Sequence, residues 1–260
     1  MSRVGRITAA TRAGWHSFLR RRTAVFFTFF FPAIIVVIFG GLVETQSGGG
    51  GLFAEPPGWY IAGYLAAVVI FTPQSRVGSE VARHREGALF EKQATTPLRR
   101  WEWLFAQTLV NTVVIGLASL LLVLVLVVGT GAPLPLSAEL LLVVPFVAVG
   151  VALFCGVGAI LGSLTDSRDG VIAASNGLAI PLLFLSEAFV TRDMLPGWLP
   201  IEASPVTYFV RGVRAVTYAP DGGTLVARWP EPTPYVDLGV LAIFAVLVFV
   251  LAAFALPRTD

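Results

Sequence analysis

Residues 103–129 read WLFAQTLVNTVVIGLASLLLVLVLVVG, and this stretch decides the fold class because it contains no Asp, Glu, Lys or Arg. About 20 apolar residues in a helix cross the roughly 30 Å hydrocarbon core of a bilayer, so this stretch can span a membrane and extend beyond it or tilt. The whole chain shares this character. Of its 260 residues, 56% are hydrophobic and 13% charged, with a mean hydropathy of +0.80, against about 45–50% and about 25% in soluble domains. The sequence therefore predicts an all-α membrane protein.

Five further apolar stretches have the length of a membrane span, which makes six in total. The first follows an Arg-rich segment, but it is longer than the apolar region of a signal peptide and no A-x-A site follows it, so we interpret it as a retained anchor. Pro181 is expected to interrupt the fifth. The predicted spans, all in a single domain of residues 1–260, are 24–43, 59–75, 103–129, 140–164, 171–190 and 236–256.

The 18 basic residues are divided unevenly between the connecting segments. Fourteen lie in the N-terminal segment, the 76–102 segment, the 165–170 turn and the C-terminal tail, whereas four lie in 191–235 and none in 44–58 or 130–139. Cytoplasmic loops carry the excess of Lys and Arg. We therefore expect a multi-pass protein of the cell membrane with both termini in the cytoplasm.

The N-terminal segment, residues 3–22, has helical periodicity with an apolar arc and a basic remainder. This pattern predicts a helix lying in the membrane interface with an Arg-rich polar face. A segment that only anchors the orientation of the chain is the alternative. The arc contains Val4, Ile7, Trp15, Phe18 and Leu19, and Arg6, Arg12, His16 and Arg20 lie away from it.

The segment between the second and third spans contains few helix breakers before Thr95. It predicts a short charged helix over residues 80–94, followed by a kink. Thr96 and Pro97 have the character of an N-cap and a first helical residue, from which a helix would lead into the third span. Leu89 and Phe90 are expected to be exposed and to seek a partner surface. A solvated loop that obeys the positive-inside rule is the alternative.

The outer segment between the fifth and sixth spans, residues 191–235, is too long for a bare connection and too apolar to lie fully in water. Residues 207–218 can form about three helical turns. Phe209, Val213 and Val216 would share one side of this helix, with Arg211 and Arg214 elsewhere. We expect re-entrant or membrane-surface helices here, packed against protein or lining a cavity.

Few polar residues fall within the predicted spans. Most of them are of the kind that forms hydrogen bonds between helices. Glu187 differs, because a carboxylate so close to hydrocarbon is a functional candidate or a buried partner, for Arg192 or Arg211. Gly158 and Gly162 have the small-residue spacing of close helix approach, either within the chain or in a dimer. The other polar residues are Gln107, Thr108, Asn111, Thr112, Ser175 and Asn176.

Several chemistries are excluded by what the sequence lacks. The only lysine, Lys92, follows Glu91, so no P-loop is present. No predicted span holds a His or a deeply placed Asp, so the sequence lacks the residues of the known intramembrane serine and aspartyl proteases. His16 and His84 belong to no metal-ligand cluster, and Cys155 is the single cysteine. The chain is expected to be no enzyme by itself and to bind no metal, cofactor or nucleic acid.

Residues 85–98, REGALFEKQATTPL, resemble the E-x-G-T-L-E-x-L-x-x-T-P-L loop of the ABC-2-type permeases, the membrane subunits of a class of ATP-driven exporters. Ala88 stands where Thr is usual and Gln93 where Leu is usual. Three further stretches, FLSEAFV (184–190), LPGWL (195–199) and SPVTYFVRGVR (204–214), resemble the family's F-L-S-G, L-P-x-W-L and N-P-x-T-Y-x-x-x-x-x-R signature. There Glu187 replaces the customary Gly, and Ser204 the customary Asn.

The resemblance implies six spans, an interfacial helix, a coupling helix and re-entrant helices between spans five and six. Two such chains, identical or paralogous, would form a conduit in the lipid membrane. Each would engage one of two copies of a separate ATP-binding subunit, which holds the ATP and Mg, through the interfacial and coupling helices. The implied ATPase-coupling residues are Arg85, Glu86, Gly87, Leu89, Phe90, Glu91, Thr96 and Pro97. The implied conduit or outer-gate residues are Asn176, Phe184, Ser186, Glu187, Phe189, Pro205, Tyr208, Phe209, Arg211 and Arg214.

The residues around the expected conduit are apolar and aromatic, which favours a hydrophobic or amphipathic cargo of the drug, lipid or glycan class. The preference for Arg over Lys suggests a GC-rich prokaryotic genome. Two alternatives remain. An ion- or proton-coupled carrier would use Glu187 and Asn176. A non-transporting scaffold or immunity protein would tolerate replacement of Glu86 and Gly87.

Overall fold

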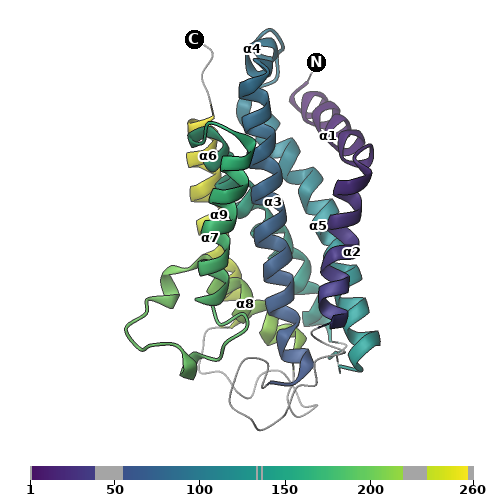
Figure 1. Cartoon of the computed structure of the whole chain (residues 1–260), viewed down its shortest axis with the longest axis vertical. Helices are drawn as coiled ribbons and strands as arrows, with labels where there is room; N and C mark the ends of the chain where they lie inside the picture. Colours follow the sequence, from purple (N-terminus) through teal and green to yellow (C-terminus); the bar gives the residue numbers. More distant parts are fainter. Residues whose placement is uncertain (1, 39–54, 133, 136, 219–232, 257–260) are drawn as a thin grey trace.

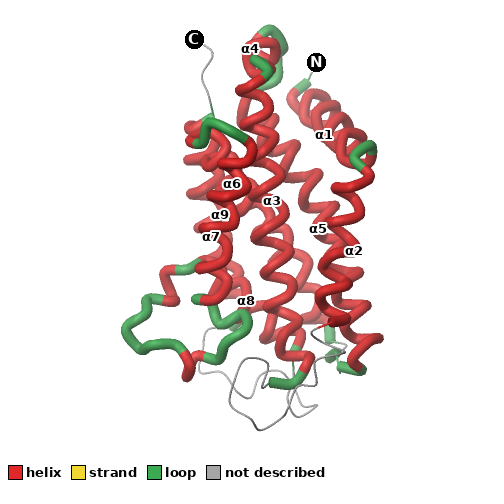
Figure 2. The backbone as a smooth tube through the Cα atoms, in the orientation of Figure 1, coloured by secondary structure: helices red, strands yellow, loops and turns green. Residues whose placement is uncertain are grey.

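The structure is a computed structural model that describes residues 2–38, 55–132, 134–135, 137–218 and 233–256. The end of the predicted first span, most of the outer loop after it, and residues 219–232 of the outer segment lie outside the described residues. Within the described ranges every regular element is a helix and there is no strand (Figure 2). The predicted all-α fold is confirmed.

The helices run mostly side by side along the long axis of the molecule (Figure 1). Four short 3-10 turns, η2 (Pro57–Tyr60), η3 (Ala138–Leu142), η4 (Arg192–Met194) and η5 (Ile201–Ala203), lie between them. The α-helices are α1 (Arg3–Leu19), α2 (Arg22–Val37), α3 (Ile61–Glu86), α4 (Leu89–Ala94), α5 (Arg100–Thr130), α6 (Val143–Leu164), α7 (Arg168–Phe184), α8 (Pro205–Thr217) and α9 (Pro234–Ala255).

Local sequence explains where several helices begin and end. The Ser2 and Ser167 hydroxyls accept hydrogen bonds from the N–H groups three residues later and so cap α1 and α7. Pro205 and Pro234 occupy the first turns of α8 and α9, where a missing N–H costs nothing. Gly131 ends α5 in the left-handed conformation, with φ of 67°.

The centre of the bundle is the pair α3 and α6, which touch backbone to backbone. A Cβ placed on Gly158 would lie 2.3 Å from the Gln74 carbonyl oxygen, and one on Gly162 would lie 2.3 Å from the Gly78 oxygen. No side chain fits at these two positions while the helices stay so close. The small-residue pattern therefore packs α6 against α3 within the chain, which settles the alternative left open by the sequence.

The other helices surround this pair. α1 and α2 pack mainly on α5, α7 packs on α3, and α9 packs on α6 and α8. The outward faces of α5 and α9 carry exposed apolar side chains, including Leu120 (68% exposed) and Phe254 (70%). Such faces suit contact with lipid tails.

Among the residues that the structure describes, three helical segments are long and apolar enough to cross a membrane: Arg100–Thr130, Ala138–Leu164 and Pro234–Ala255. They correspond to the third, fourth and sixth predicted spans. α2 is a shorter apolar helix. The prediction for the fifth span is wrong in two respects, because α7 continues past Pro181 and then ends at Phe184 rather than near residue 190.

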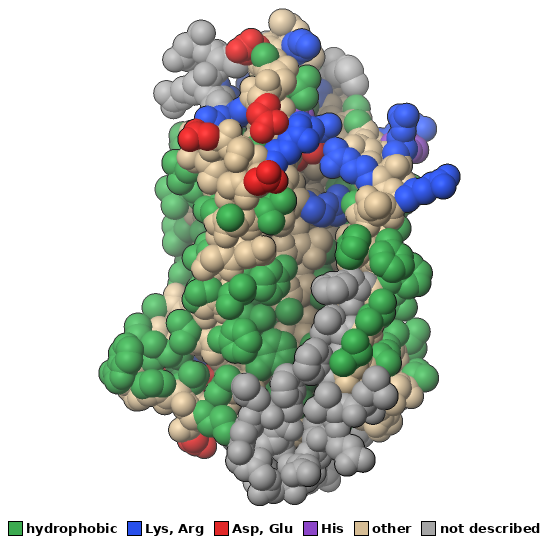
Figure 3. Space-filling model, viewed as in Figure 1, with side chains coloured by type: hydrophobic (Ala, Val, Ile, Leu, Met, Phe, Trp, Pro, Cys, Tyr) green, Lys and Arg blue, Asp and Glu red, His purple; other side chains and the backbone are tan. Residues whose placement is uncertain are grey.

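Charge divides the molecule into two ends. Lys and Arg side chains gather over α1 and the neighbouring end of α3, above a band of hydrophobic side chains (Figure 3). We call the end that holds α1, α4 and the start of α5 the basic end. The end that holds η2 and α8 is the opposite end.

Candidate functional site

The sequence-predicted coupling residues lie at the basic end, where α3 breaks before α4. The predicted single helix over residues 80–94 is wrong, because α3 runs to Glu86 and α4 begins only at Leu89. The Gly87 N–H still bonds to the Arg83 carbonyl, and Ala88 then takes a positive φ of 50°. That left-handed residue turns the chain, so α4 is a separate helical turn.

Phe90 is buried, which contradicts the expectation that it is exposed. Its ring packs edge-on against His84 of α3 (5.1 Å between centroids) and Trp103 of α5 (5.7 Å). His84 also packs on Trp103 (5.1 Å). The His84 imidazole is half-buried between the two rings. The three rings fasten α4 to α3 and α5, while Leu89 is half-buried and Glu91 is exposed.

Arg85 and Glu86 face the turn between α6 and α7. The Arg85 guanidinium donates to the carbonyls of Gly162 (3.3 Å), Ser163 (3.0 Å) and Thr165 (2.7 Å), which have no partner inside their helix. Glu86 forms an ion pair with Arg168 of α7 at 3.2 Å. These contacts link the end of α3 to the turn between α6 and α7.

Thr96 and Pro97 do not begin a helix. α5 starts at Arg100, because the Glu102 carboxylate accepts the Arg99 N–H at 2.9 Å and so caps its first turn. Both Thr96 and Pro97 are exposed in the connection before it. The predicted N-cap is wrong, because the helix begins three residues after Pro97 with Arg99 as its N-cap residue, and Glu102 at the third helical position accepts the Arg99 N–H.

Glu102 is a residue that the sequence analysis missed. Its carboxylate is fully buried and accepts hydrogen bonds from Nε and Nη2 of Arg6, which joins α1 to α5. The only signal was its place as an acid in the first turn of a long apolar helix. The pair fixes the predicted interfacial helix to the bundle.

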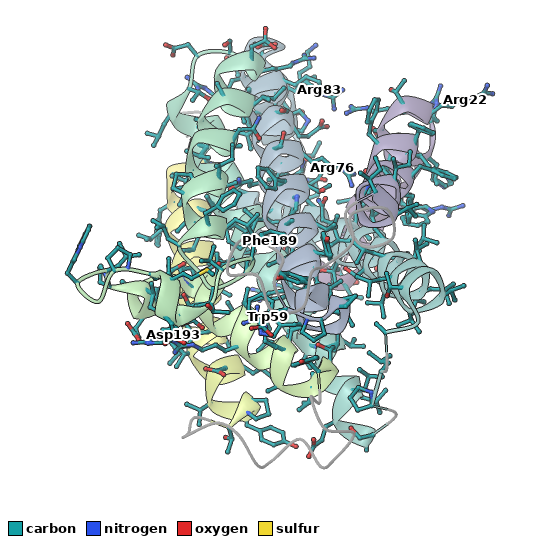
Figure 4. The ribbon with its side chains drawn as sticks, turned by 60° about the horizontal axis from the view of Figure 1, so that its bottom comes forward. Arg22, Trp59, Arg76, Arg83, Phe189 and Asp193 are labelled. Carbon is teal, nitrogen blue, oxygen red and sulfur yellow. The ribbon has the colours of Figure 1, made fainter. Side chains whose placement is uncertain are left out.

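Arg214 is the central residue at the opposite end. Its side chain is 2% exposed, although the helical pattern assigned it to the side away from the apolar residues. The guanidinium stacks on Trp59 at 3.5 Å and donates to the carbonyls of Trp59 (3.3 Å), Glu187 (2.7 Å) and Ala188 (3.4 Å). Burial lowers its pKa to about 10, so it stays charged at neutral pH. Figure 4 labels Trp59 and Phe189 in this region.

The Glu187 carboxylate lies between the two arginines proposed from the sequence. Nη2 and Nε of Arg211 approach its oxygens at 3.1 and 3.3 Å, and Nη1 of Arg192 lies 3.5 Å away. Arg192 also donates to Glu202 at 2.8 Å, which lowers the pKa of that carboxyl. These four side chains tie the turn after α7 to η4, η5 and α8.

The remaining conduit candidates differ in their exposure. Asn176 and Phe184 are exposed on α7, and Phe189, Pro205, Tyr208 and Arg211 are partly buried. Ser186, Phe209 and Arg214 are buried inside the chain, where the Ser186 hydroxyl donates to the Leu183 carbonyl at 2.7 Å. These three side chains are enclosed by other described residues of the same chain.

Glu187 has a positive φ of 61°, a conformation that favours glycine. Glu187→Ala loses the pair with Arg211 and keeps the unfavourable backbone, whereas Glu187→Gly loses the pair but relieves the backbone. We expect the Gly variant to be more stable than the Ala variant by about 1 kcal/mol. Thermal unfolding of the two detergent-solubilised variants measures the difference. Equal midpoints would contradict the strained backbone.

Among the residues described, no group of three His, Cys, Asp or Glu could hold a metal ion. The candidate residues at both ends of the bundle are held by arginine hydrogen bonds and aromatic contacts between helices.

Comparison with known proteins agrees with this geometry. No curated protein matches the chain. A family model described as ABC-2 type transporter matches residues 6–218, which reach from α1 to the end of α8 and include both ends of the bundle described above. The chain belongs to the ABC-2 type transporter family.

Proposed function

We propose that this chain is the permease subunit of an ABC exporter and crosses the cell membrane six times with both termini in the cytoplasm. α2, α3, α5, α6, α7 and α9 would be the spans. The gathering of Lys and Arg at one end supports this orientation, since that end would face the cytoplasm. The exposed apolar faces of α5 and α9 are the expected lipid contacts.

Energy would come from a separate ATP-binding subunit, in two copies, each holding ATP and Mg. Two permease chains, identical or paralogous, would complete the exporter. The absence of a Gly-Lys pair from this sequence supports this division, because a P-loop cannot be built from it. The aromatic residues of the 184–209 region favour a hydrophobic or amphipathic cargo of the drug, lipid or glycan class.

The proposal rests on the contacts at the basic end that join α4 to α3 and α5 and join the end of α3 to the α6–α7 turn. α4 is fastened by Phe90 to α3 and α5, and the end of α3 holds the α6–α7 turn through Arg85 and Glu86. A partner that pushes on the exposed side of α4 would therefore move four of the proposed spans together.

The ion-coupled alternative receives less support. The Glu187 carboxylate is held by Arg211 and is 2% exposed, and Asn176 is exposed on α7. A carrier that bound protons at Glu187 would first have to release it from the guanidinium.

The test separates binding of the partner from transmission. Glu91→Ala alters the exposed surface of α4 and is expected to weaken association with the ATP-binding subunit. Arg85→Gln removes the clamp on the α6–α7 turn and is expected to preserve association while lowering vanadate-sensitive ATP hydrolysis by the complex. Co-purification and phosphate release measure the two effects.

Asp193→Ala is the matched control. Asp193 is an exposed acid at the opposite end, and its side chain forms no ion pair within the described residues. The substitution should leave both readouts unchanged. Unaltered association and hydrolysis in both Glu91→Ala and Arg85→Gln would contradict the proposed coupling and favour a non-transporting role.

A further inference from the structure

We propose that the junction of α1 and α2, together with the facing side of α3, binds the headgroup of an anionic phospholipid. The site, which we call the junction site, consists of Arg21, Arg76 and Arg83 around Glu80, and Arg20 and Arg22 flank Arg21 in the chain. The proposal does not depend on ATP-driven export, because it concerns only what this surface recognises.

The junction site has a large excess of positive charge. Glu80 is its only acid, and it is shared by Arg21 (3.4 Å) and Arg83. Residues 1–43 contain no Asp or Glu. Arg20 and Arg22 are exposed and form no salt bridge with any residue in the described ranges. Arg21, Arg76 and Arg83 against one glutamate leave a net charge of +2, and Arg20 and Arg22 add two positive charges next to Arg21 in the chain.

Hydrogen-bond donors at the site lack acceptors. The Arg76 guanidinium lies over the Phe18 ring at 4.4 Å, and its buried Nη1 has no hydrogen-bond partner. Nε of Arg83 is also buried without a partner. Buried donors are normally satisfied, so these two indicate that acceptor oxygens are missing. Arg76 and Arg83 lie on the side of α3 toward α1 and α2 (Figure 4), and phosphate oxygens are strong acceptors for arginine.

The position of the site points to a lipid. Lys and Arg side chains of the basic end lie directly above a band of hydrophobic side chains (Figure 3). From Arg22 onward, α2 carries the exposed rings of Phe26 (48%), Phe27 (60%) and Phe30 (54%), and Phe26 stacks on Phe30 at 5.3 Å. A phosphate at the arginines would therefore have its acyl chains along these rings. Basic clusters at the cytoplasmic surface attract anionic lipids in this way.

Native mass spectrometry of the purified chain tests the proposal with equal amounts of phosphatidylglycerol and phosphatidylcholine that have identical acyl chains. The unmodified chain is expected to retain phosphatidylglycerol preferentially. The double variant R21Q/R83Q should lose that preference by about five-fold for each charge removed. Glu80→Gln should increase it by a similar factor, and this variant leaves every arginine in place.

The double variant R168Q/R192Q is the charge-matched control and should keep the preference. Equal retention of the two lipids by the unmodified chain would overturn the proposal, as would an equal loss in both double variants or no gain in Glu80→Gln. A further arm adds inorganic phosphate. Displacement of the lipid by phosphate at equimolar concentration would assign the site to a soluble anion and overturn the lipid assignment.

Discussion

Replacing Gly158 with alanine is expected to destabilise the fold by about 3 kcal/mol, because overpacking at a backbone contact cannot relax by side-chain movement. The new Cβ would lie 2.3 Å from the Gln74 carbonyl oxygen and 2.7 Å from the Gln74 Cα. α3 and α6 would have to separate along their central contact. The midpoint of thermal unfolding in detergent should fall by about 6–12 °C.

Gly116→Ala is the matched control for this substitution. Gly116 lies within α5, and a Cβ placed there meets nothing within 4 Å. Alanine is the better helix former, so the control should be neutral or slightly stabilising. An equal fall in both variants would show that α3 and α6 are not in backbone contact.

Arg214→Ala is the second change with a large expected effect. It removes a charged donor from the carbonyls of Trp59, Glu187 and Ala188 in a buried site. Leaving such acceptors unpaired costs about 1–3 kcal/mol each where no water enters, so we expect a loss of about 3 kcal/mol in total. Thermal unfolding and recovery by size-exclusion chromatography measure it.

Two further variants, Arg214→Lys and Arg192→Ala, test whether the loss of stability is due to the buried guanidinium of Arg214. Lysine keeps the charge but cannot stack on Trp59 and reach several carbonyls with a planar fork, so Arg214→Lys should remain clearly destabilised. Arg192 is 60% exposed and its ion pairs are solvated, so Arg192→Ala should cost less than about 1 kcal/mol. If Arg214→Ala were as mild as Arg192→Ala, the central role of Arg214 would be contradicted.

Much of this architecture could be predicted because it follows from local sequence. Apolar length predicted the all-helical fold, and helical spacing predicted a helix close to α8. The pairing of Glu187 with Arg192 and Arg211 was also anticipated, because a carboxylate near hydrocarbon needs cationic partners and few were at hand. The two motifs at residues 85–98 and 184–214 pointed to the family to which the chain belongs.

Other features depend on contacts that no local pattern contains. Periodicity put Arg214 with the polar residues, yet its guanidinium is buried because Trp59, 155 positions away in sequence, offers a ring and a carbonyl. Phe90 is buried for the same reason, since Trp103 reaches it from the next helix. Pro181 favoured a break in α7, whereas the helix ends three residues later, where Glu187 and its arginines hold the turn.

The sequence predicted that α6 has a close helix contact, but it did not identify the helix that makes this contact. The spacing of Gly158 and Gly162 suits any close helix contact, within a chain or between two chains. Only the position of Gly78 and Gln74 on α3 identifies the surface that the glycines meet. Sequence alone could not choose, because the pattern marks one side of an interface and says nothing of the other.

We propose that an ATP-binding subunit drives this chain through its basic end, and gentle extraction of the tagged protein from its own membranes tests this coupling. We expect mass spectrometry to identify a co-purifying ATP-binding chain, and we expect Gly87→Pro, which disturbs the break between α3 and α4, to weaken the association. Recovery of the protein without such a chain, under conditions where a known permease keeps its partner, would contradict the coupling and favour an ion-coupled carrier.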